Sequence, residues 1–319
     1  MSVFVYGRMT LNLCRSYHHR CIGFDAAECR NNLDKIKYEY FLRRTNSKNS
    51  QISKIKCNIQ DVKVKPNDME CCMYRQVFNM QRSIIINSDE HTKSFNILNG
   101  ILKCRQAMIH PSLIQGGTHG SSSKFDIIKS KLLTHLDEKC IIFCHFKKEM
   151  VLLYDNIVDI YSKDKISMVN GDMSSFERDE QFHNFEMRGN VLIIQIKVGG
   201  VGLNLQHASH VYLTSPSWNP ATDLQAIHRS YRTGQQKTVT VTRFFMEHVD
   251  DLPSIDLAIL HLQNQKQELT NEVLSEHKGT NLLNSDSDIA DNGSIKYFAK
   301  VFNSGSYLPT CKTISQLDT

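Results

Sequence analysis

The segment VLIIQIKVGGVGLNLQHASHVYLTSPSWNPATDLQAIHRSYRTGQ, residues 191–235, decides the fold. It contains two short apolar runs, at 191–196 and 210–215, and a stretch at 221–232 that predicts a helix. A short strand that is apolar at almost every position is typical of a sheet covered by helices on both faces. The segment therefore predicts buried parallel strands joined by helical connections.

The same alternation extends on both sides of this segment. Further strands are predicted at CIIFCHF (140–146), ISMVNG (166–171) and VTVTRFF (239–245). Helices are predicted at 124–136, at 147–162, at 175–187 and in a stretch with apolar positions at Ile255, Ile259, Leu262 and Leu269. Strands that alternate with helices predict an α/β fold built on a parallel sheet.

Residues before 124 predict a strand and two helices. The strand lies in SKIKCNIQDVKV (53–64), and the helices in MECCMYRQVFNMQ (69–81) and FNILNGILKCRQAMIH (95–110). The second helix should end at the proline that follows, because the residue before a proline disfavours helical geometry. QGGTHGSSS (115–123) predicts a surface loop. A short helix around YFAKVF (297–302) is expected in the polar C-terminal stretch.

Composition and charge narrow the classes of function. The 319 residues carry a formal net charge of +5, a small excess that only mildly favours anionic partners. We find no apolar run of the roughly 18 residues that a membrane span needs and no secretory signal, so an intracellular protein without a membrane partner is expected. Ten irregularly spaced cysteines predict reduced thiols. The best metal candidate, Cys14 with His18, His19 and Cys21, lacks the paired spacing of a zinc finger, so no metal site is predicted.

Two loops are candidate ligand sites, because ligands of parallel α/β folds bind outside the carboxyl ends of the strands. KVGGVGLNL (197–205) follows the strand at 191–196, and its glycines permit either a tight turn or the close approach of a ligand. The second loop, SPSWNP (215–220), leads into the helix predicted at 221–232.

Gln225, Arg229 and Arg232 have the spacing i, i+4, i+7, which places them on one arc of a helix. A solvated basic face is one interpretation of such arginines. The other is phosphate capture, because the planar guanidinium group binds phosphate oxygens in pairs and an arginine brought to a γ-phosphate accelerates phosphoryl transfer. The glycine-rich loop one element earlier favours the second interpretation.

The sequence contains no G-x-x-x-x-G-K-[ST] phosphate cradle, and GGTHGSSSK (116–124) has the wrong spacing for one. SIIINSDEH (83–91) has the pattern of an apolar strand followed by an Asp-Glu pair that binds magnesium. Without an upstream cradle to hold a nucleotide, a polar loop is the favoured interpretation of this stretch.

The segment VGGVGLNLQHASHVYLTSPSWNPATDLQAIHRSYRTGQ (198–235) resembles the fifth and sixth motifs of the Swi/Snf-type ATPases, the double-stranded-DNA translocases of helicase superfamily two. Other stretches resemble further motifs of that family in the same order, so that the resemblance covers about residues 36–276: FLRRTNS (41–47), CRQAMIHPSLI (104–114), IIFCHF (141–146), NGDMSSFERDEQFHNF (170–185) and SIDLAILHLQNQKQELTNEVL (254–274). Tyr231, within the stretch Arg-Ser-Tyr-Arg, resembles the branch of the family that includes the transcription-termination ATPase of flies.

The resemblance implies the second, C-terminal RecA-like lobe of such an enzyme, with helical flanks and the end of a first lobe attached. In the family, ATP and Mg²⁺ lie between two lobes, and the first lobe brings the phosphate cradle and the Asp-Glu box. Carried over, the family roles divide into three sets: γ-phosphate contact by Arg229 and Arg232; helix orientation and loop coupling by Gln225, Gly200, Gly202 and Asn204; and a place near the DNA track or lobe interface for Lys197 and Trp218.

The expected organisation is a leader at 1–35, the end of a first lobe with a helical interlobe segment at 36–123, the C-terminal lobe with its following helix at 124–278, and a polar tail at 279–319. Three positions depart from the family pattern. Gln195 replaces a small hydroxyl residue, Ser215 stands where aspartate is common, and His228 replaces a frequent aspartate.

Two hypotheses follow. The chain is half of a DNA-dependent ATPase, inactive without a first lobe supplied in cis by a longer product or in trans by a partner. Alternatively, it is a non-enzymatic lobe that binds DNA or a complex, or a degenerate relic. Double-stranded DNA is the expected partner in the first case, and a nuclear location, or a viral replication site for a viral protein, follows from that partner.

Overall fold

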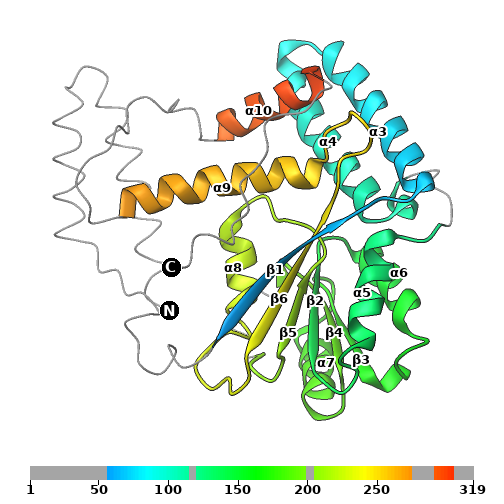
Figure 1. Cartoon of the computed structure of the whole chain (residues 1–319), viewed down its shortest axis with the longest axis vertical. Helices are drawn as coiled ribbons and strands as arrows, with labels where there is room; N and C mark the ends of the chain where they lie inside the picture. The colour runs from blue at the N-terminus through cyan, green and yellow to red at the C-terminus, as the bar shows by residue number, and fades with distance from the viewer. Residues whose placement is uncertain (1–55, 115–119, 199–204, 275–290, 305–319) are drawn as a thin grey trace. The chain divides into compact units, whose positions relative to one another are not determined.

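The computed structural model describes residues 56–114, 120–198, 205–274 and 291–304, and all of them belong to one compact unit. Six strands form a single sheet in the order β1–β6–β5–β2–β4–β3 (Figure 1). They are β1 (Cys57–Val64), β2 (Cys140–Cys144), β3 (Ile166–Val169), β4 (Val191–Gln195), β5 (His210–Leu213) and β6 (Val239–Met246). Every neighbouring pair is parallel, which confirms the predicted α/β fold.

Helices cover both faces of the sheet. They are α3 (Asp68–Ile86), α4 (Glu90–Ile109), α5 (Ser123–Leu133), α6 (Lys147–Ile157), α7 (Ser175–Met187), α8 (Pro220–Ile227), α9 (Ile255–Leu274) and α10 (Asp291–Ser304), with short 3-10 turns at Pro111–Leu113 and Lys163–Lys165. Successive strand side chains point to opposite faces. Ile142 therefore packs in the core beneath α3–α6, α9 and α10, whereas Ile141 packs in the core beneath α7 and α8.

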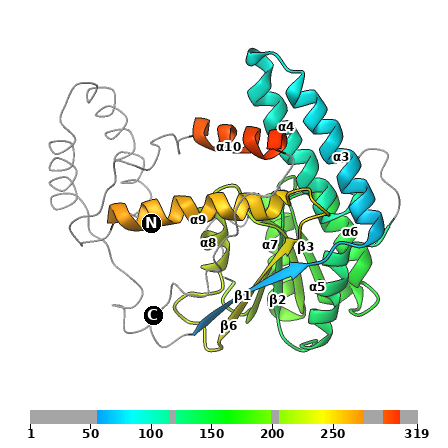
Figure 2. The same ribbon diagram turned by 45° about the horizontal axis from the view of Figure 1, so that its top comes forward.

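The helix boundaries follow from local chemistry. Asn67 and Glu70 form a capping box at the start of α3, and Ser174 and Glu177 form another at the start of α7. Helix α4 ends one residue before His110, as the proline at position 111 predicts. Helix α10 confirms the helix expected at YFAKVF, and it lies against α3 and α4 in both views (Figure 2).

Two features differ from the sequence expectations. Residues 83–86, predicted as part of a polar loop, are the last turn of α3, because Ile85 is fully buried while the polar residues after Ile86 only cap and link the helices. Strand β1, expected in the end of a first lobe, pairs along its whole length with β6 and is an edge of the same sheet. The domain boundary at 123 stays a prediction, and the leader lies outside the described residues.

A buried ion pair joins the carboxyl ends of the strands to the surrounding helices. Lys124 Nζ of α5 lies 2.5 Å from Asp256 Oδ2 of α9, and both side chains are 0% exposed. Lys124 also donates to the Thr214 carbonyl at 3.1 Å, and Asp256 accepts from the Met246 amide at 3.1 Å. The pair therefore fixes the ends of β5 and β6 relative to two helices.

The cysteines at positions 71, 72, 104, 140 and 144 are free thiols, as predicted. The Cys14 cluster lies outside the described part of the chain. Among the described helices, none combines the length and the apolar character needed to cross a membrane.

A pair of stacked histidines predicts acid sensitivity. The rings of His135 and His210 lie 3.8 Å apart, and His135 Nε2 lies 2.9 Å from the Tyr212 hydroxyl. Burial, with the charge of His210, lowers the pKa of His135 to about 4, whereas the pKa of a histidine in an unfolded chain is about 6.5. The unfolded chain therefore binds more protons in this window, and the free energy of unfolding should fall as pH drops from about 6.5 towards 4.

The measurement is the melting temperature at several pH values between 7.5 and 4.5. A His135→Gln variant should lose less stability over that range than the unsubstituted chain. Other buried histidines give both proteins a common decrease, so an identical decrease in the two would contradict a role for the stacked pair.

Candidate functional site

Gln195 joins the carboxyl ends of three neighbouring strands. Its Nε2 donates to the His145 carbonyl just after β2 at 3.5 Å, and its Oε1 accepts from the Gly171 amide just after β3 at 3.1 Å. A small hydroxyl side chain could not span these two partners. The family departure at position 195 is thus accommodated by hydrogen bonds that hold this edge of the sheet together.

The loop after β5 is fastened by an arginine from outside the lobe's sheet. Arg105 of α4 donates from Nη2 to Ser215 Oγ at 3.1 Å and to the Pro216 carbonyl at 2.8 Å. Burial lowers the pKa of Arg105, and nearby carboxylates oppose that effect. At the end of the loop, the Asn219 side chain accepts from the Ala221 amide at 3.1 Å and caps α8.

The structure places the two residues predicted near a DNA track or lobe interface in different surroundings. Trp218 is half-buried: its ring stacks on Phe298 of α10, with centroids 5.4 Å apart, and Lys266 Nζ of α9 lies 5.4 Å from the ring centre. Lys197 is exposed in the turn after β4. Burial and the charge of Arg105 lower the pKa of His145, and the charge of Lys197 makes a smaller contribution in the same direction. The DNA role of both stays a prediction.

The predicted helix over 221–232 is wrong at its C-terminal end. Helix α8 ends at Ile227, and the chain continues in tight turns in which the Arg229 amide donates to Ala226 at 3.2 Å and the Arg232 amide donates to Ser230 at 3.1 Å. Gln225 lies in α8, half-buried, but both arginines lie after it. The three side chains therefore do not share one helical arc.

Residues 228–235, here called the arginine turn, are fastened to residues 205–208, which follow the glycine-rich loop. The Leu205 amide donates to the Arg229 carbonyl at 3.2 Å, and Gln235 Nε2 donates to the Ala208 carbonyl at 2.9 Å. The 205–208 segment leads into the amino end of β5, and the arginine turn leads into the amino end of β6. The two strand ends lie together, because the Thr240 amide at the start of β6 donates to the Ser209 carbonyl at 2.8 Å. Helix α8 thus starts at the carboxyl edge and carries the arginines back along the sheet, away from that edge.

The electrostatics of the arginine turn suit an anion. Burial lowers the pKa of Arg229, and the positive charge of Arg232 lowers it further, so the two guanidinium groups act on one another. Arg232 is exposed and makes no salt bridge with a described residue. Two neighbouring guanidinium groups are a suitable donor set for the oxygens of a phosphate chain.

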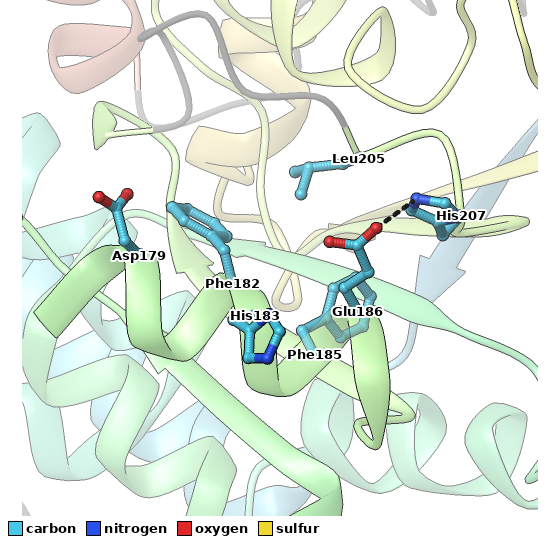
Figure 3. A pocket seen from close by; sticks show the side chains of 7 residues that line it. All are labelled: Asp179, Phe182, His183, Phe185, Glu186, Leu205 and His207. Carbon is cyan, nitrogen blue, oxygen red and sulfur yellow. Dashed lines mark ion pairs between the residues drawn. The ribbon is translucent and has the colours of Figure 1, made fainter. Parts of the chain in front are cut away.

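A cavity of about 250 Å³ is lined by α7 and the 205–208 segment (Figure 3). Five residues of α7 and two residues from the segment line it: Asp179, Phe182, His183, Phe185, Glu186, Leu205 and His207. His207 Nε2 lies 3.2 Å from Glu186 Oε1, which ties the segment to α7. These residues were not predicted from the sequence, although the helical spacing of the α7 members could have placed them on one face.

Four glycine-loop residues of the sequence prediction, Gly199, Gly200, Gly202 and Asn204, lie outside the described residues. In the part of the chain that the structure describes, no three His, Cys, Asp or Glu side chains gather as a metal site would require.

Gly234 offers a test of the fastening between the two segments. Its φ of +103° is a conformation that side-chain-bearing residues rarely adopt, and an added Cβ would lie 2.5 Å from Gln206 Oε1. Gly234→Ala should therefore lower the free energy of unfolding by about 1–3 kcal/mol. Chemical denaturation measures the loss. Gly171→Ala, where no unusual φ is required, is the control, and an equal effect of both substitutions would contradict the strain argument.

Comparisons with known proteins place the lobe. Residues 123–234 match the model of the helicase conserved C-terminal domain. The chain is 27% identical over 282 residues to the ISWI chromatin-remodeling complex ATPase ISW2 of Saccharomyces cerevisiae, covering 81% of this chain and 24% of that protein. It is 32% identical over 177 residues to transcription termination factor 2 of Drosophila melanogaster, covering 53% of this chain and 16% of that protein. The chain thus spans less than a quarter of the length of either relative.

Solved structures share the fold. The C-terminal part of the Fun30 ATPase domain superimposes with a TM-score of 0.56 at 17% identity, covering 78% of this chain and 97% of that one. The Sulfolobus solfataricus SWI2/SNF2 ATPase core in complex with double-stranded DNA gives a TM-score of 0.57 at 23% identity, covering 79% of this chain and 53% of that one. The matched domain and the six-stranded parallel sheet agree: residues 123–234 are similar to helicase C-terminal domains, and the lobe described here has the RecA-like fold of the C-terminal lobes of Swi/Snf-type ATPases.

Proposed function

We propose that the chain acts as the second lobe of a DNA-dependent ATPase and translocase, and that Arg229 and Arg232 contact the γ-phosphate of ATP bound by a first lobe. The observation that carries the proposal is the arginine turn itself. Backbone and side-chain hydrogen bonds hold the turn to the 205–208 segment, the charges of Arg229 and Arg232 act on one another, and the Arg232 side chain is exposed.

ATP with Mg²⁺ is the cofactor that this donor set fits. The guanidinium groups would bind γ-phosphate oxygens, and their charge would offset the negative charge that spreads over those oxygens during transfer. The proposal assigns the phosphate cradle and the Mg²⁺ ligands to the first lobe, supplied in cis by a longer product or in trans. Residues of the present lobe would orient the phosphate chain.

Double-stranded DNA is the proposed polymer partner. Two observations support it: a relative of this chain is a chromatin-remodeling ATPase, and a protein of the same fold was solved with double-stranded DNA. A nuclear location, or a viral replication site, follows from this partner. Contacts of translocases to phosphates position a protein without reading base sequence, so binding should be independent of sequence and weaken with salt.

The test uses the full chain fused behind, or mixed with, a first lobe of a Swi/Snf-type relative, here called the two-lobe assembly. ATP turnover by the assembly should rise when duplex DNA is added, equally for unrelated sequences, and the stimulation should decline as salt increases. Turnover that ignores duplex DNA would contradict the proposed function.

A further inference from the structure

Gln263 of α9 is a buried polar side chain that contacts the start of α8. It is 4% exposed, and its Nε2 lies 2.5 Å from the Ser217 carbonyl and 2.9 Å from Asp223 Oδ2. A buried amide normally satisfies its own hydrogen bonds within the core. Gln263 does so by donating to two groups of the connection that leads to the arginine turn.

Asp223 receives this contact in the first half of α8. It is 5% exposed, and the same Oδ2 accepts from the Ser217 amide at 3.1 Å, so that one carboxylate oxygen links α8 to the loop before it and to α9. Burial raises the pKa of Asp223, and the hydrogen bonds from Ser217 and Gln263 oppose that rise. The neutral amide of Gln263 therefore stabilises a carboxylate that burial destabilises.

The shortness of α8 couples this contact to the arginines. The helix has only eight residues and ends at Ile227, about 6 Å beyond Asp223 at 1.5 Å per residue and two positions before Arg229. A helix this short holds its direction through tertiary contacts rather than through its own hydrogen bonds. The contact of Gln263 with Asp223 and Ser217 fixes its first half, and the 205–208 segment holds the turn that follows it.

We propose that Gln263 is a positioning residue for the arginine turn: by holding Asp223 and Ser217, it sets the direction of α8 and hence where Arg229 and Arg232 are presented. The effect of Gln263 on the direction of α8 is a property of the chain alone, and only its consequence for ATP turnover rests on the proposed function.

The first experiment measures hydrogen–deuterium exchange of the full chain, comparing amides of residues 225–235 with amides of α5. In Gln263→Leu, which removes the donor, exchange in 225–235 should accelerate by about tenfold, the equivalent of one lost hydrogen bond, while α5 changes little. Gln265→Leu is the matched control, because Gln265 lies on the same helix but contacts His261. Equal acceleration in α5, or no acceleration in 225–235, would overturn the proposal.

The second experiment uses Gln263→Glu, which keeps the size of the side chain. At low pH one of the paired carboxyl groups holds a proton and restores a hydrogen bond, whereas at higher pH the two carboxylates repel each other. The pKa of the introduced group is thus raised in the folded state, and its stabilising effect is lost as pH rises. Exchange in 225–235 relative to the unsubstituted chain should therefore accelerate between pH 5 and 8, and a pH-independent ratio would overturn the proposal.

The two-lobe assembly extends the test to catalysis. Gln263→Leu should lower kcat for ATP by about tenfold with a smaller change in KM, because misplaced arginines lose contacts made in the transition state. If turnover proves insensitive to Arg232→Ala, the proposed function fails while the exchange results still decide the positioning role. If Arg232→Ala abolishes turnover and Gln263→Leu leaves kcat unchanged, the positioning role fails and the proposed function stands.

Discussion

Arg232→Ala in the two-lobe assembly is expected to reduce duplex-DNA-stimulated ATP turnover by roughly a thousandfold, the lower end of what an arginine contributes in phosphoryl transfer. The side chain is exposed and makes no salt bridge with a described residue, so its removal should leave the melting temperature of the chain nearly unchanged. Steady-state turnover and thermal denaturation measure the two effects. Loss of turnover without loss of stability separates a catalytic role from a structural one.

Two variants sharpen the result. Arg232→Lys keeps the charge but loses the planar fork, so it should recover only a small part of the turnover. Lys237 lies in the same connection between α8 and β6; its side chain is 67% exposed, and its Nζ lies 3.8 Å from Glu138 Oε2. Lys237→Ala therefore removes a nearby cation and should have little effect on turnover. Full turnover in Arg232→Ala, or an equal loss in Lys237→Ala, would refute the assigned role.

The second large effect concerns the buried pair of Lys124 and Asp256. Asp256→Ala should lower the free energy of unfolding by about 3–5 kcal/mol, because it leaves a fully buried ammonium group without its counter-charge. Denaturant titration measures the loss. A fraction of the variant that is unfolded without denaturant would reflect a larger loss of the same kind.

The matched control replaces both partners. Lys124→Met combined with Asp256→Asn removes both charges, and the asparagine oxygen can still accept from the Met246 amide as Asp256 does. The double variant should recover most of the stability lost by Asp256→Ala, since a neutral pair of similar volume avoids the desolvation of two ions. A double variant that is less stable than Asp256→Ala would contradict the account of an uncompensated charge.

The strands were predictable because they are short, apolar at almost every position and separated by helices. The runs at 140–144 and 191–195 need no partner information to be identified as buried strands. The alternating apolar positions of β1 predict a strand, but its edge position was not predictable, because its pairing with β6 joins segments about 180 residues apart. Tertiary contacts of that kind leave no local pattern in the sequence.

The candidate site was predictable in its residues but not in its geometry. Periodicity placed Arg229 and Arg232 on one helical face, whereas α8 stops at Ile227 because the 205–208 segment and Gln235 hold the following residues in turns. Gln263 was missed because it lies inside an apolar helix pattern, and only its three-dimensional neighbours distinguish it from an ordinary core residue.

In the proposed function, this chain completes an ATPase site that it does not hold alone. The most direct test compares ATP turnover, with duplex DNA present, by the purified chain, by the first lobe and by the two-lobe assembly. We expect background turnover for each piece and clear turnover only for the assembly. Turnover by the chain alone that disappears in Arg232→Ala, or an assembly no faster than the first lobe by itself, would contradict it.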